Sequence, residues 1–69
     1  MKLHYLLEMM PRTAFVHIED NNNELLFRGT AFNALKQRIG NREVFTLFSM
    51  CDYTYGCVLF ISLEGDSDD

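Results

Sequence analysis

Leucine and methionine recur with a helical spacing at the start of the chain. The positions i, i+3, i+4 and i+7 are held by Leu3, Leu6, Leu7 and Met10. This spacing predicts a short helix with one apolar stripe. Pro11 disfavours helical backbone at the residue before it, so we expect the helix to end at Met10.

Two pairs of strands are predicted downstream, with a second helix between them. The segments typical of strands are 13–19, 24–29, 43–51 and 57–63. An Asn-rich turn joins the first two strands, and a five-residue loop, 52–56, joins the last two, so each pair is expected to form a hairpin. Residues 31–39 have a helical period, with Thr30 as the N-cap and Gly40 at the C-terminal stop.

The order helix–strand–strand–helix–strand–strand predicts an α+β fold. Its simplest packing is a four-stranded antiparallel sheet with two short helices on one face. A chain of 69 residues has room for one domain, which we place at 1–63. The remaining segment, 64–69, holds four acids among Gly and Ser, and we expect it to be a disordered acidic tail.

Composition and charge exclude several classes of protein. Residues 1–63 balance six acids with six bases, so the net charge of −4 lies in the tail, and this charge disfavours binding to nucleic acid. A hydrophobic content of 48% is too high for a disordered chain. No apolar run approaches the ~20 residues that span a bilayer. With two cysteines and no convincing secretion signal, we expect a cytoplasmic protein.

The last two strands carry more apolar residues than one chain can cover. Within 44–51 and 57–63 only Thr46, Ser49 and Ser62 are polar. In a sheet with one face in contact with water, hydrophobic and polar residues alternate along each strand. Two short helices cover one face, so we predict that a second copy covers the other and that the protein is a homodimer. The predicted interface residues are Phe45, Leu47, Val58 and Phe60. The alternative is a three-layer monomer in which the first helix crosses to the second face.

Cys51 and Cys57 flank the last loop and leave three interpretations open. They could form a redox pair, contribute to a metal site with His17, or be two small buried hydrophobes. The five-residue gap and the distant histidines favour the last, although spacing alone leaves a Cys51–His17 catalytic pair open. The carboxylates lie on turns and in the tail, with no pair on a rigid element, so we predict no catalytic residue, metal or cofactor.

The hairpin tips hold the candidate contacts to another protein. Tyr53 and Tyr55 lie in the last loop, and tyrosine is enriched at protein interfaces, although both rings could fold back over the core. The acids around the first turn form the other candidate surface: Glu19, Asp20 and Glu24.

An acid-free basic segment supports an alternative function. Its bases are Arg28, Lys36, Arg38 and Arg42. Such a segment is typical of a regulatory or nucleic-acid-associated protein.

The stretch from Lys2 to Leu35, KLHYLLEMMPRTAFVHIEDNNNELLFRGTAFNAL, resembles small uncharacterised proteins from phages and prophages of Gram-positive bacteria. The similarity lies in the layout: a leucine-rich helix, a proline, a strand ending in acids, an Asn-rich turn and an "LLFRG" strand. The resemblance implies a non-enzymatic inhibitor that binds a host protein, such as an anti-CRISPR protein or another inhibitor of a nucleic-acid-targeting defence nuclease.

Overall fold

The structure, a computed structural model, describes residues 1–54 and 56–65. Its elements are α1 (Leu3–Glu8), β1 (Phe15–Glu19), β2 (Leu25–Thr30), α2 (Ala31–Ala34), β3 (Val44–Asp52) and β4 (Gly56–Leu63). This order confirms the predicted one and the α+β class. The predicted contact Tyr55 lies outside the described residues, as does the predicted acidic tail from residue 66 onward.

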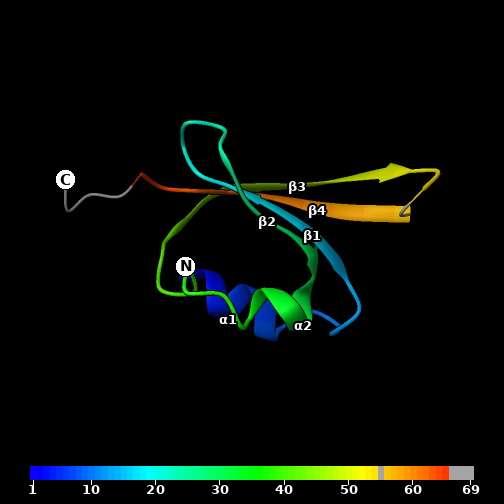
Figure 1. Ribbon diagram of the computed structural model, residues 1–69, viewed down its shortest axis with the longest axis horizontal. Helices are drawn as coiled ribbons and strands as arrows, with labels where there is room; N and C mark the ends of the chain where they lie inside the picture. The colour runs from blue at the N-terminus through cyan, green and yellow to red at the C-terminus, as the bar shows by residue number, and fades with distance from the viewer. Residues whose placement is uncertain (55, 66–69) are drawn as a thin grey trace.

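The four strands form one mixed sheet in the order β2-β1-β4-β3, shown in Figure 1. Both hairpins are antiparallel, but β1 pairs with β4 in parallel, so the prediction of a wholly antiparallel sheet is wrong at its centre. The turn residues predict each hairpin, because the two paired strands are neighbours in the sequence. No local pattern predicts which strand of one hairpin pairs with which strand of the other. The pairing that places the two strands with fully buried core residues side by side is the parallel one.

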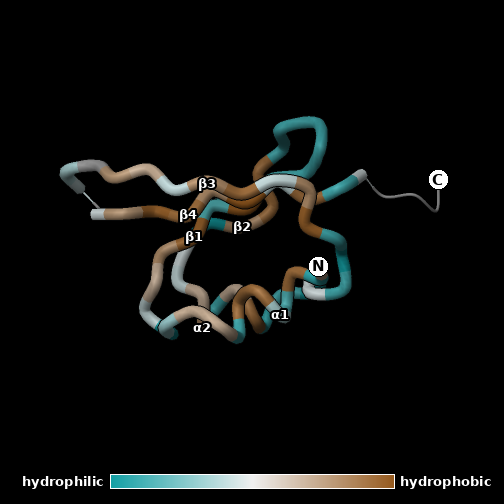
Figure 2. Tube along the Cα trace, turned by 180° about the vertical axis from the view of Figure 1, so that it is seen from behind, coloured by the Kyte–Doolittle hydropathy of each residue, from teal (hydrophilic) through white to brown (hydrophobic). Residues whose placement is uncertain are grey.

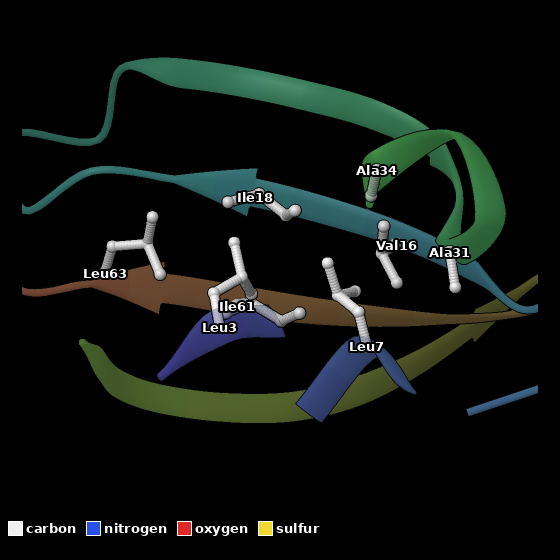
Figure 3. Packing of buried hydrophobic residues seen from close by; sticks show 8 residues of the cluster. All are labelled: Leu3, Leu7, Val16, Ile18, Ala31, Ala34, Ile61 and Leu63. Atoms are coloured by element: carbon white, nitrogen blue, oxygen red, sulfur yellow. The ribbon is translucent and has the colours of Figure 1, made fainter. Parts of the chain in front are cut away.

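Both helices lie on one side of the sheet and supply half of the core. Figure 3 shows the eight clustered side chains: Leu3, Leu7, Val16, Ile18, Ala31, Ala34, Ile61 and Leu63. The apolar stripe of α1 therefore packs against alternate residues of β1 and β4, as its spacing predicts.

The second helix is shorter than its sequence pattern predicts. It begins as expected, because the Thr30 hydroxyl oxygen accepts a hydrogen bond from the Asn33 N–H at 3.3 Å. It ends at Ala34 rather than at Ile39, since Ala31 and Ala34 are its buried residues while Phe32 and Leu35 are exposed. Ile39 still packs against the core, but from beyond the helix. Helices draw most of their stability from packing, so the exposed Phe32 and Leu35 in the middle of the stripe do not support further helical turns.

The helical layer does not reach the far end of the sheet. In Figures 1 and 2 the β3–β4 hairpin extends well past α1 and α2, and Figure 2 shows hydrophobic residues along both of its strands. The outer end of this hairpin therefore has no helix over it, whereas its inner end, with Ile61 and Leu63, belongs to the core.

Candidate protein-binding surface

Strand β3 is an edge strand that is uncharged up to its last residue, Asp52. The sheet order gives it one neighbouring strand, β4, and its nine residues carry no charged side chain from Val44 to Cys51. From Thr46 to Asp52 its register against β4 is regular. An edge of this kind presents a row of main-chain N–H and C=O groups that another strand can pair with.

The start of β3 is covered by the first residues of the chain. The Val44 N–H donates to the Met1 carbonyl at 2.8 Å, and the Leu3 N–H donates to the Arg42 carbonyl at 2.9 Å. The Glu43 carboxylate also pairs with the Met1 ammonium at 2.9 Å and with Lys2 Nζ at 3.3 Å. The terminal ammonium first, and then Lys2, lower the pKa of Glu43 by hydrogen bonding. The open part of the edge therefore begins after Val44.

Large hydrophobic side chains stand exposed on both faces of β3. Leu47 is 46% exposed, and Phe48 and Met50 are each 54% exposed. Phe48 lies opposite Phe60, on the face away from the helices, whereas Leu47 lies opposite the core residue Ile61. We call Leu47, Phe48 and Met50 the β3 apolar strip.

This register corrects the predicted dimer interface. The prediction places Phe45, Leu47, Val58 and Phe60 on one face, but Leu47 and Phe60 lie on opposite faces of the sheet. Val58 is 1% exposed, so the chain itself already covers it, and Phe60 is half-buried against Phe48 and His17, with ring centroids 5.4 and 4.6 Å away. Phe45, at an irregularity in the pairing, is 66% exposed. A bulge shifts the alternation of a strand, and strict alternation in the sequence misses it.

The hairpin tip is closed by a disulfide. Cys51 and Cys57 lie directly opposite each other in the ladder and are bonded. Both are exposed, so the interpretation of the pair as buried hydrophobes is wrong. Beyond them the Tyr53 side chain is fully exposed and does not fold back over the core.

His17 lies on the other face from the cysteines and belongs to a polar chain. Arg28 donates to His17 Nδ1 at 2.7 Å, so the His17 Nε2–H donates to Glu19 Oε2, also at 2.7 Å. His17 pairs with Phe60 in the ladder, and Cys57 has the opposite orientation. A Cys51–His17 catalytic pair or shared metal site is therefore excluded. Within 1–54 and 56–65, no three His, Cys, Asp or Glu side chains are grouped to hold a metal.

The acids of the β1–β2 turn have mostly structural contacts. Asp20 Oδ1 accepts from the N–H groups of Asn22 and Glu24, at 2.8 and 3.0 Å, and Asn23 adopts a φ of 65°. Asn tolerates this left-handed conformation, which the Asn-rich turn predicts. With Glu19 bonded to His17, Glu24 is the most exposed of the three predicted contact acids.

The basic segment does not form one patch. Arg28 lies on the sheet face away from the helices, beside His17. Lys36 and Arg12 flank the Phe32 ring on α2, with cation-to-centroid distances of 4.4 and 5.3 Å. Arg42 donates to the Glu64 carbonyl at 3.1 Å. Arg12 lies outside the basic segment 28–42, so the sequence pattern does not group it with Lys36. The fold brings both side chains to the Phe32 ring.

Comparisons with protein-family models, with curated proteins and with solved structures find no match for this chain. None of the helices in the described part of the chain has the length and apolar content needed to cross a bilayer. The resemblance of residues 2–35 to phage proteins therefore stays a prediction. The geometry of the β3–β4 hairpin surface is the main support for a function.

Proposed function

We propose that this protein is a small, non-enzymatic protein-binding module that contacts its partner through the β3–β4 hairpin. The observation that carries the proposal is the β3 apolar strip, three large hydrophobic side chains that are about half exposed on a strand whose outer part extends past the helices. Leaving one large side chain exposed forgoes ~1.5–3 kcal/mol, so a partner that covers several gains substantial free energy.

Tyr53 extends this surface to the hairpin tip. Its ring is fully exposed, next to the disulfide that joins the two strands. A tyrosine on a short closed loop loses little conformational entropy on binding, which suits a contact residue.

The resemblance of residues 2–35 supports a target class. Within the proposal, the partner is a host protein, and a nucleic-acid-targeting defence nuclease fits the anti-CRISPR-like inhibitors that this resemblance implies. Glu24 adds one exposed acid at the opposite turn. The neutral balance of residues 1–63 favours contact through the hairpin over imitation of a nucleic acid.

Matched tyrosine variants test the proposal by affinity capture from bacterial lysate with quantitative mass spectrometry. Tyr53→Ala should lower recovery of the partner at least tenfold, about 1.4 kcal/mol, because it removes an interface aromatic. Tyr5→Ala, which removes the 57%-exposed tyrosine of α1, should leave recovery unchanged. The proposal fails if the wild-type chain retains no specific partner, or if both variants behave alike.

A nucleic-acid-associated function has less support, because Arg28 lies on the sheet face away from the helices, whereas Lys36 lies beside α2 on the helical side. A gel shift over a salt titration tests it directly. Absence of binding at low ionic strength would rule out the nucleic-acid-associated function.

A further inference from the structure

The two edges of the sheet differ in a way that points to strand pairing at only one of them. Strand β2, the other edge, has six residues, a register shift next to Leu25, and Arg28 within it. A short, irregular and charged edge resists pairing with another chain. The open part of β3, Thr46–Asp52, is regular and has no charge before its last residue.

We propose that the open edge of β3 pairs antiparallel with β3 of a second copy, so that two four-stranded sheets join into one. This goes beyond the proposed function, because it needs no foreign protein. The centre of the open segment is Ser49, which places the twofold axis there. The predicted grouping of Phe45, Leu47, Val58 and Phe60 in a face-to-face dimer is replaced by an edge-to-edge arrangement.

The register set by this axis places apolar side chains opposite apolar side chains on both faces of the joined sheet. Phe48 then lies opposite Met50 of the second copy, and Leu47 lies opposite its Cys51. Sulfur–aromatic and apolar pairs across neighbouring strands both stabilise a sheet. Because the segment from Val44 to Cys51 is uncharged, a second copy of it sets no like charges opposite one another.

The uncovered hairpin also leaves room for a second copy. A twofold axis normal to the sheet places the helices of both copies on the same side. In Figures 1 and 2 the helices stop short of the outer half of the hairpin, so this half extends beyond the helical layer. The Phe48 and Met50 side chains of both copies would meet on the opposite face.

The exposed area indicates a weak dimer. Half-exposed Leu47, Phe48 and Met50 present on the order of 300 Å² per copy, taking about 200 Å² for a large side chain. Two copies would remove at most about 600 Å² through these side chains, and main-chain pairing must supply the rest of a ~1,200 Å² interface. We therefore expect dissociation upon dilution to low micromolar concentration.

Sedimentation velocity of the purified chain, from ~1 to ~200 µM, tests the proposal. The wild type should shift from monomer to dimer over this range. Ser49→Lys, which sets two ammonium groups opposite each other at the axis, should weaken association at least tenfold. The matched control is Leu25→Lys, a lysine on the β2 edge, and it should associate like the wild type.

A second variant keeps the test independent of any folding defect in the first. Ser49→Cys should form a disulfide-linked dimer on mild oxidation, whereas Asn33→Cys, at an exposed position on α2, should not. A wild type that stays monomeric throughout, a Ser49→Lys variant that associates normally, or equal cross-linking of both cysteine variants would each overturn the proposal. A monomeric wild type whose captured partner is lost in Ser49→Lys would instead assign the edge to a foreign strand.

Discussion

Glu43 illustrates how one exposed side chain determines where the open edge of β3 begins. Its carboxylate pairs with the Met1 ammonium and with Lys2, and both contacts lie beside the Val44–Met1 main-chain bond. These cations stabilise the ionised carboxylate and lower its pKa.

Glu43→Gln should therefore destabilise the protein modestly at neutral pH. A carboxyl group with a lowered folded-state pKa stabilises the fold above its unfolded pKa, and this contribution is lost as pH falls through the folded one. Urea unfolding of both proteins at pH ~7 and ~2.5 should show a difference in free energy that disappears at the lower pH. An equal difference at both pH values would mean that the ion pairs are not its cause.

Local residue roles are predictable from the sequence where the chemistry is local. The Thr30 cap and the left-handed Asn23 follow from their residue types beside a helix and within a turn. The polar chain from Arg28 through His17 to Glu19 is not predictable in this way, because it depends on the register of β1 against β2.

At the scale of elements, the disulfide distinguishes the tip of the β3–β4 hairpin from the rest of the sheet. It closes a loop between residues six positions apart and fixes the pairing of Cys51 with Cys57. Reduction should lower the free energy of unfolding by ~2 kcal/mol through the entropy of the unfolded chain.

Urea unfolding with and without reductant measures this effect, and the Cys51→Ser/Cys57→Ser double variant, which reductant cannot change, is the control. Alkylation of the folded, unreduced protein should modify neither cysteine. Two alkylated cysteines in that sample would show that the bond is absent.

The elements themselves are largely predictable, because periodicity and turn residues are local signals. The length of α2 is not, since its end depends on which stripe residues meet the core. The parallel pairing of β1 with β4 is also hidden, because no residue pattern in either strand encodes its neighbour in the other hairpin.

At the scale of the whole molecule, one layer of two short helices covers a sheet that is longer than the layer. The excess of hydrophobic residues in the last two strands is visible in the sequence. The sequence suggests that it exposes a whole face of the sheet, but in the structure the exposed side chains lie mainly on one strand. The inner strand β4 buries Val58, Ile61 and Leu63, so the surplus remains on β3, at the edge. The edge, rather than a sheet face, is therefore the surface to test.

Residue-resolved hydrogen exchange at low and high protein concentration tests this central claim most directly. The account predicts that alternate amides within Thr46–Asp52 exchange quickly in the dilute chain and more than tenfold more slowly when it is concentrated, because a second β3 accepts their hydrogen bonds. The amides of β2, Leu25–Thr30, should exchange at the same rate at both concentrations. Unchanged exchange in β3, or new protection in β2 instead, would contradict it.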